Sequence, residues 1–201
     1  MQKNNVTRGF GLLEGLLAKK RAKLANKLIH DNMRIGSILD IGCGSYPYFL
    51  SNTEFATKYG IDKVVDSNPN IQKELGINLM NHDFENEDLL PFDNDYFNVI
   101  TMLAVFEHIE PIRIPIVLNE IFRTLKPGGI FILTTPAIWT DKLLRFLAKV
   151  RLVSPLEIEE HKDAYNFDKI KNHFEKTNFN LDNIKLGYFE MYMNIWGFIT
   201  K

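Results

Sequence analysis

The chain has 201 residues, a formal net charge of −1 and one cysteine. This length suits one domain with a sizeable core, and the near-zero charge excludes a global field that would recruit nucleic acid or acidic lipid. The single Cys43 excludes an internal disulfide and is typical of a reducing compartment. The five histidines lack close ligand spacing, so the sequence predicts no metal site.

The N-terminal part of the chain predicts an amphipathic helix over residues 8–30, with leucines at three- and four-residue spacing and most lysines on the opposite face. Residues 1–35 hold eight Lys and Arg against two Asp and Glu, a net charge of +6. This basic face is either solvated or contacts a membrane surface or an anionic substrate. Because Lys19–Arg21 directly follow the leucines, neither a signal peptide nor a spanning helix is predicted, and we expect a cytoplasmic protein.

A glycine turn follows the first predicted strand. Ile38–Ile41 form a short apolar run of the kind found in buried parallel strands. The run stops at Gly42–Gly44, where two glycines allow a tight turn and a close approach of the backbone to a ligand. Residues 46–50 can then open a helix, with Pro47 tolerated in its first turn. A strand, a glycine turn and a helix start together predict a cofactor cradle, with Asp40 at the strand end.

Three more strands are predicted before the middle of the chain. Residues 57–62 and the weaker run 77–83 each end in an acid, Asp62 and Asp83. A short helix beginning at Asn68–Asn70 lies between them, and residues 96–103 form the fourth strand. Because parallel strands end at the same edge of a sheet, these acids are expected near the glycine turn.

The alternation of strands and helices continues. A helix is predicted from Pro111 through Leu125, closed by Lys126–Gly129, where cation, proline and glycine stand in the places expected of a helix stop. The apolar run 130–135 is the fifth strand. This alternation predicts right-handed crossovers and a parallel sheet.

The last third of the chain changes character. Residues 139–153 are apolar and basic, and either pack on the core with their cations at the surface or cap a substrate pocket and contact something anionic or lipidic. Asn166 can cap a helix, and the extended runs 180–190 and 191–200 are too close in sequence for a crossover, so they should pair antiparallel.

By the motifs that these segments carry, the chain resembles the class I S-adenosylmethionine-dependent methyltransferases, most closely the type 11 and ubiquinone-biosynthesis-like branch. The resemblance covers residues 35–135 well and the rest loosely. It rests on the order and spacing of individually weak motifs: Leu39–Gly44, Gly60–Asp62, Asp83–Phe84, Leu90–Phe92, Phe97–Ile100, Glu107–His108 and Leu125–Gly129.

The resemblance implies a Rossmann-like α/β fold: a seven-stranded, mostly parallel sheet with the last strand antiparallel and helices on both faces. It also implies one methyltransferase domain over residues 1–201, with a basic amphipathic helix in 1–34, a cofactor-binding core in 35–135, and a substrate cap with closing strands in 136–201. The implied function is methylation of a small molecule at oxygen, nitrogen or carbon, with S-adenosylmethionine as cofactor.

The resemblance assigns the cofactor contacts residue by residue. Asp40 would hold the amino end of the cofactor, Asp62 the ribose hydroxyls and Asp83 the adenine amino group. The remaining implied contacts are Gly42, Cys43, Gly44, Lys63, Phe84, Leu103 and Ala104. The family often has a third glycine two positions after Gly44, and here that position is Tyr46.

Three residues are candidates for a general base, in the order His108, His161 and Tyr165. Both histidines are equally compatible with structural roles. The predicted partner is a small-molecule methyl acceptor, hydrophobic or lipid-linked acceptors included, with at most peripheral membrane contact and no nucleic acid.

Alternatives from other classes stay open at this point. A catalytically silent member of the family would bind the cofactor or a partner without turnover. The spacing of Asp62 from the turn also suits an NAD(P)-dependent oxidoreductase, but Pro47 stands where the dinucleotide pattern needs its third glycine. Nucleic-acid methylation finds little support, since the chain has no basic domain.

Overall fold

The computed structural model describes residues 13–63, 65, 69–84, 86–149 and 152–201. The first five residues of the predicted N-terminal helix, 8–12, lie outside the described residues, as do Lys3, Asn68 and Arg151. Within the described part of the chain, no helix combines the length and apolar character needed to cross a membrane.

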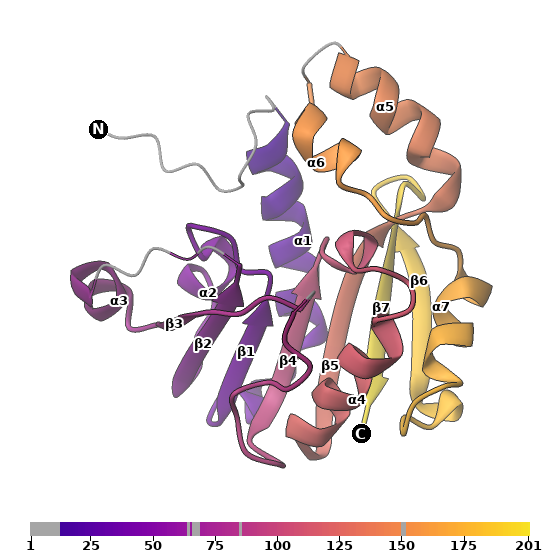
Figure 1. Cartoon of the computed structure of the whole chain (residues 1–201). Helices are drawn as coiled ribbons and strands as arrows, with labels where there is room; N and C mark the ends of the chain where they lie inside the picture. The colour runs from indigo at the N-terminus through magenta and orange to yellow at the C-terminus, as the bar shows by residue number, and fades with distance from the viewer. Residues whose placement is uncertain (1–12, 64, 66–68, 85, 150–151) are drawn as a thin grey trace.

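A seven-stranded sheet of order β3-β2-β1-β4-β5-β7-β6 forms the middle layer (Figure 1). Strands β1 to β5 run parallel, and β7 lies antiparallel between β5 and β6. The strands are β1 (Ser37–Ile41), β2 (Thr57–Asp62), β3 (Asn78–Asn81), β4 (Phe97–Leu103), β5 (Leu125–Pro136), β6 (Ile184–Phe189) and β7 (Asn194–Thr200). This arrangement confirms the predicted fold class. The inserted antiparallel β7 also differs from the 3-2-1-4-5-6 order typical of dinucleotide-binding folds.

Helices cover both faces of the sheet, which is why β1 is buried along its whole length. On one face α1 (Glu14–Leu28) and α2 (Tyr48–Ser51) pack in one apolar cluster with Ile38. On the other, α4 (Ile114–Thr124) and α7 (Phe167–Phe174) pack in a second cluster with Leu39. Neighbouring strand residues thus bury their side chains against opposite helical layers.

The remaining helices lie around this core. A further α-helix, α3 (Pro69–Leu75), connects β2 to β3. Two more, α5 (Asp141–Lys149) and α6 (Pro155–Glu159), lie above the carboxyl ends of the parallel strands (Figure 1). Short 3-10 turns occur at η1 (Asp31–Met33), η2 (Phe106–His108), η3 (Ile138–Thr140) and η4 (Leu181–Asn183).

Local signals in the sequence were accurate in some places and wrong in others. Asn166 caps α7 as predicted, its side chain accepting a hydrogen bond from the Lys169 N–H. Helix α4 ends at Thr124, next to the predicted stop at Lys126–Gly129, but β5 begins at Leu125 and not at Ile130, so the residues of the stop are part of the strand. A register shift opposite Phe97 and a positive φ at Gly128 accommodate these residues within the strand.

Candidate cofactor and acceptor site

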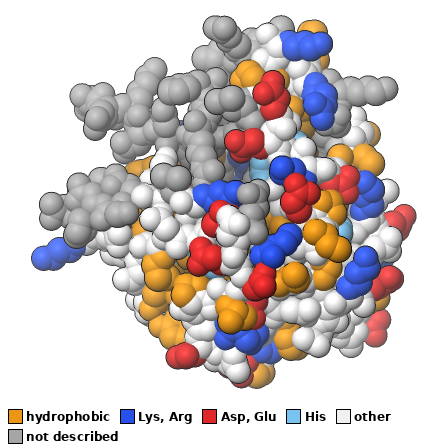
Figure 2. All heavy atoms as spheres, in the orientation of Figure 1, with side chains coloured by type: hydrophobic (Ala, Val, Ile, Leu, Met, Phe, Trp, Pro, Cys, Tyr) orange, Lys and Arg blue, Asp and Glu red, His pale blue; other side chains and the backbone are white. Residues whose placement is uncertain are grey.

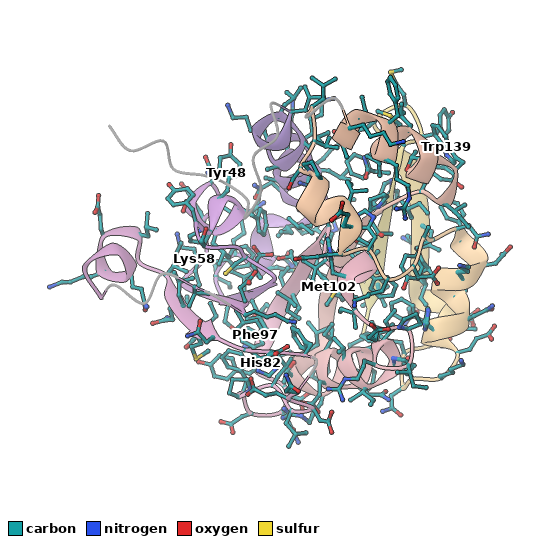
Figure 3. All side chains as sticks on the ribbon, turned by 45° about the horizontal axis from the view of Figure 1, so that its top comes forward. Tyr48, Lys58, His82, Phe97, Met102 and Trp139 are labelled. Atoms are coloured by element: carbon teal, nitrogen blue, oxygen red, sulfur yellow. The ribbon has the colours of Figure 1, made fainter. Side chains whose placement is uncertain are left out.

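A cavity of about 510 Å³ opens at the carboxyl edge of the parallel strands. Its floor comes from the loops after β1, β2, β3 and β4, and its roof from α1, α5 and the segment around α6. Tyr48 on the α2 side and Trp139 on the cap side lie at opposite sides of this edge (Figure 3). The roof residues are mostly apolar: Leu13, Leu17, Ala18, Leu143, Leu144, Leu147, Val153 and Ile158.

The glycine turn is held tightly against the neighbouring strand ends. Gly42 has a φ of 73°, and a Cβ at this position would lie 2.2 Å from a methyl carbon of Val105. The N–H groups of Gly42 and Cys43 donate to the Ile61 carbonyl at 2.8 and 3.1 Å. The Gly44 N–H donates to the Asp62 carboxylate at 3.0 Å. Two glycines thus bring the backbone into the cavity wall, where a side chain has no room.

Asp40 is a buried carboxyl group on the cavity floor. The Thr101 hydroxyl lies 2.6 Å from its Oδ1 and is the hydrogen-bond partner. Burial raises the pKa of Asp40 to about 7, and the Thr101 hydrogen bond opposes this shift. The Asp40 carboxyl group can therefore lose its proton near neutral pH when a cationic group binds beside it.

The residues after β3 are divided between the cavity and its rim. His82 and Phe84 line the cavity, their rings 4.5 Å apart in an edge-to-face contact. Burial lowers the pKa of His82, and its Nε2 has no hydrogen-bond partner among the described residues. Asp83, by contrast, lies off the cavity wall, where its carboxylate meets the Lys63 ammonium at 3.4 Å and the Asn86 amide at 2.8 Å. His82 was not among the residues predicted from the sequence, although it stands next to Asp83 after a strand end.

The turn after β4 holds a residue in an unusual conformation. Ala104 has a φ of 58°, in the left-handed region that residues with a Cβ rarely adopt. Its N–H donates to the carbonyl and the hydroxyl of Thr134 at 2.9 and 3.1 Å. Ala104 and Leu103 line the cavity here. Such backbone strain concentrates at functional sites, where the surroundings enforce it.

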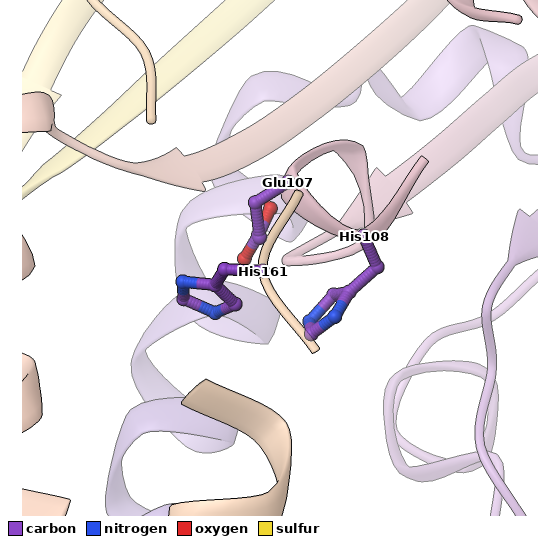
Figure 4. Close-up of side chains that lie close together, drawn as sticks. All are labelled: Glu107, His108 and His161. Atoms are coloured by element: carbon purple, nitrogen blue, oxygen red, sulfur yellow. The ribbon is translucent and has the colours of Figure 1, made fainter. Parts of the chain in front are cut away.

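Three potential proton-carrying groups meet on the cavity wall. Glu107 and His108 come from η2, and His161 follows α6 (Figure 4). Their ligand atoms all lie within 4.8 Å of one another. The Glu107 side chain, 2 % exposed, has a carboxylate oxygen without a hydrogen-bond partner in the described parts of the chain. Burial raises the pKa of Glu107, and the nearby His161 opposes this shift.

The loop that carries His161 is fixed to η2 by its backbone. The Lys162 N–H donates to the Glu107 carbonyl at 2.8 Å, and the Lys162 ammonium pairs with Glu110 at 3.1 Å. The two imidazole rings meet edge to face, their centroids 4.9 Å apart. Two imidazoles and a carboxylate can move a proton or bind a divalent transition metal. The sequence placed His108 and His161 as candidates, but it gave no sign that residues 53 positions apart would meet Glu107.

Tyr165, the third candidate base, lies apart from this group. Its side chain is fully buried in the core, with its ring 4.9 Å from that of Phe106. Burial raises its pKa, and its hydroxyl has no hydrogen-bond partner among the described residues. It does not belong to the residues that line the cavity. Tyr165 is therefore a residue of the core and does not face the cavity.

Comparisons with known proteins agree with the fold. A S-adenosylmethionine-dependent methyltransferase from Archaeoglobus fulgidus superposes with a TM-score of 0.64 at 15% identity, covering 94% of each chain. A Thermotoga maritima protein described as a S-adenosylmethionine-dependent methyltransferase, possible histamine N-methyltransferase, gives 0.65 at 17% identity and covers 92% of this chain and 90% of its own. A Haloferax volcanii structure of the Trm112 methyltransferase activator with a putative methyltransferase gives 0.61 at 14% identity, covering 93% and 92%.

The family itself is shown by sequence. A family model described as a methyltransferase domain matches residues 12–184, most of the chain. The match spans the glycine turn, the acids at the strand ends and the loop with His161. It therefore covers both the floor and the roof of the cavity. The chain belongs to the methyltransferase-domain family.

Proposed function

We propose that this protein transfers a methyl group from S-adenosylmethionine to a small molecule with an apolar body and a polar, nucleophilic end. The proposal rests on the residues that line one cavity. Its floor consists of turns that carry acidic residues, and its roof is mostly apolar. The roof and floor come from all three parts of the chain, 1–34, 35–135 and 136–201. This shared cavity supports their grouping into one methyltransferase domain.

The floor residues fit the cofactor. Gly42, Cys43 and Gly44 line the cavity, so a ligand can approach the backbone of the turn. Buried Asp40 is suited to the cationic amino group, and Asp62 at the end of β2 to the ribose hydroxyls. His82 and Phe84 offer an edge and a ring for the adenine base. We propose Gly44, Cys43, Lys63, Leu103 and Ala104 as the further contacts.

When bound, S-adenosylmethionine supplies an electrophilic methyl group on a positively charged sulfur that needs no further activation. The protein then has to hold the acceptor, exclude water and receive a proton where the acceptor carries one. The apolar roof serves the first two tasks. His161, with the Glu107 carboxylate beside it, is placed to accept the proton, and His108 to orient the acceptor.

The cofactor assignment predicts a loss of affinity in Asp62→Ala. Calorimetry with S-adenosylhomocysteine should show binding weakened by about 1–3 kcal/mol, because the hydrogen bonds to the ribose are lost. The exposed Asp182, which lies in η4 and does not line the cavity, gives a matched control, Asp182→Ala. Unchanged affinity in Asp62→Ala would mean that the acid is misassigned. Absence of binding to the folded wild-type protein would contradict the proposed function.

A second prediction concerns pH. Burial raises the Asp40 pKa from 3.8 to about 7 in the folded protein. The folded state therefore binds this proton more tightly than the unfolded state does. The resulting contribution to the free energy of unfolding is complete below about pH 4 and is lost as the pH rises through 7. A cationic ligand needs the ionised form, so affinity for S-adenosylhomocysteine should fall about tenfold between pH 8 and pH 6.

Calorimetry in buffers of different ionisation enthalpy measures this linkage directly. Below pH 7, binding should release a proton from the wild-type protein. Asp40→Asn, which keeps a hydrogen-bond partner for Thr101, should bind more weakly and lose both the pH dependence and the proton release. An equally steep pH dependence in Asp40→Asn would assign the titration to another group.

An assay of methyl transfer distinguishes an active enzyme from a family member that binds the cofactor without catalysis. Methyl transfer to acceptors from a panel of hydroxylated and aminated apolar molecules would support the proposal. Tight binding of S-adenosylhomocysteine without transfer to any of them would instead favour a binding role.

A further inference from the structure

The helix α5 has apolar side chains on two sides. On the inner side Leu144, Leu147 and Ala148 pack with Leu17, Val153 and Ile158, and the two leucines line the cavity. On the outer side Trp139, in the 3-10 turn η3 that leads into α5, is 54 % exposed, and Phe146 on α5 is 60 % exposed. Their spacing of seven residues, about two helical turns, places them on one side. Leu143 lines the cavity and is 38 % exposed. Trp139 lies at the outer edge of the molecule in Figure 3.

The tip of the β6–β7 hairpin extends this stripe. Met191 and Tyr192 are 82 % and 69 % exposed, and the Trp139 indole N–H donates to the Tyr192 carbonyl at 3.1 Å. Glu190, Met191 and Tyr192 all have positive φ values of 52°, 56° and 67°. Three consecutive left-handed residues with a Cβ are strained. The strained tip is held in place with its two apolar side chains facing outward.

Trp139, Phe146, Met191 and Tyr192 therefore form one exposed surface, which we call the cap surface. Two cations lie beside it: Arg145 and Lys149 are exposed on α5. The Glu190 carboxylate at the hairpin tip is paired with Lys20 at 3.6 Å. Figure 2 shows basic and hydrophobic side chains next to one another where α5 lies.

We propose that the cap surface docks on the headgroup region of an anionic lipid bilayer. Large apolar and aromatic side chains with cations around them match such an interface, where rings enter the acyl boundary and cations meet lipid phosphates. A protein partner with an acidic rim is the competing occupant. The lipid surface is favoured because α5 also forms the cavity roof, so an apolar acceptor could pass from the bilayer to the cavity along one helix.

Vesicle sedimentation tests the proposal with the full chain. The wild-type protein should sediment with vesicles of phosphatidylcholine mixed with phosphatidylglycerol, and less with phosphatidylcholine alone or at high salt. The double variant Trp139→Ser/Phe146→Ser should bind about tenfold more weakly or worse. The matched control is Leu89→Ser/Ile112→Ser, because these side chains are 70 % and 83 % exposed and do not belong to the cap surface.

Indole fluorescence and binding of S-adenosylhomocysteine test the same proposal independently. Indole emission should shift to shorter wavelength on anionic vesicles, and Trp139→Phe should abolish the shift although Trp196 remains. Binding of S-adenosylhomocysteine should be equal in wild type and cap variant, which separates docking from folding and from the proposed function. Failure of the wild type to bind anionic vesicles would overturn the proposal, as would equal losses in both double variants. A dimer abolished by the cap variant, without vesicle binding, would assign the surface to a protein partner.

Discussion

Replacing His161 by glutamine should lower the rate constant of methyl transfer by about 10²- to 10⁴-fold, the range expected when a general base is removed. Affinity for S-adenosylhomocysteine should stay unchanged, because His161 lies beside Glu107 and is not among the proposed cofactor contacts. Glutamine keeps hydrogen-bonding capacity but cannot take up a proton near neutral pH. Single-turnover assays against pH measure the effect, since the wild-type profile should show an ascending limb that His161→Gln lacks.

Several variants test this assignment. Exposed His30 lies outside the cavity lining, so His30→Gln should leave the rate unchanged. Glu107→Gln should lower the rate less than His161→Gln, because the neutral amide no longer stabilises the positive charge that His161 acquires with the proton. A full rate in His161→Gln would move the role to His108. A rate that falls on chelation and returns with Zn²⁺ would assign the three groups to a metal ion.

Gly42→Ala should lower the free energy of unfolding by about 2–5 kcal/mol. About 1–2 kcal/mol comes from placing a Cβ in the left-handed region, and about 1–3 kcal/mol from overpacking against Val105. Because we propose that the same turn contacts the cofactor, affinity for S-adenosylhomocysteine should fall as well. Urea unfolding with constant slope measures the stability change.

Other glycines of the chain separate the two contributions. Gly76 also has a positive φ, 62°, but a Cβ there meets nothing within 4 Å, so Gly76→Ala should show the strain alone. Gly15 in α1 has open space and no positive φ, and Gly15→Ala should stabilise by about 0.5–1 kcal/mol. Equal losses in Gly42→Ala and Gly76→Ala would mean that Val105 moves aside. Adding Val105→Ala to Gly42→Ala should restore part of the stability.

The sequence predicted the core of the fold because its signals are local. The apolar residues Ile38, Leu39 and Ile41 predict a strand covered on both faces, and the glycines after them predict a turn. Likewise, the absence of a helical crossover before the last strand required antiparallel pairing, as β6 and β7 show. The start of β5 was not predicted: α4 ends next to Lys126–Gly129 as a helix stop requires, but the same residues form an irregular strand start through the pairing of Leu125 with Phe97.

The candidate site was less accessible to sequence reasoning, because its wall is assembled from distant segments. Glu107 and His161 come together only when the chain after α6 crosses back over η2, a path set by tertiary contacts. Likewise, a local pattern reveals that residues 139–153 are apolar and basic, but not which side chains of α5 turn inward. That division depends on the packing of Leu144 and Leu147 against α1 and the segment around α6.

The insertion of β7 beside β5 affects how the newly synthesised chain folds. Ile130–Leu133 in β5 are fully or almost fully buried, and in the described part of the chain their outer edge pairs with Thr200 to Gly197 of β7. Until the last strand arrives, a nascent chain presents an apolar edge of the kind that templates aggregation. The segment that closes the sheet therefore also protects it, and loss of the final strand would show itself first as insolubility.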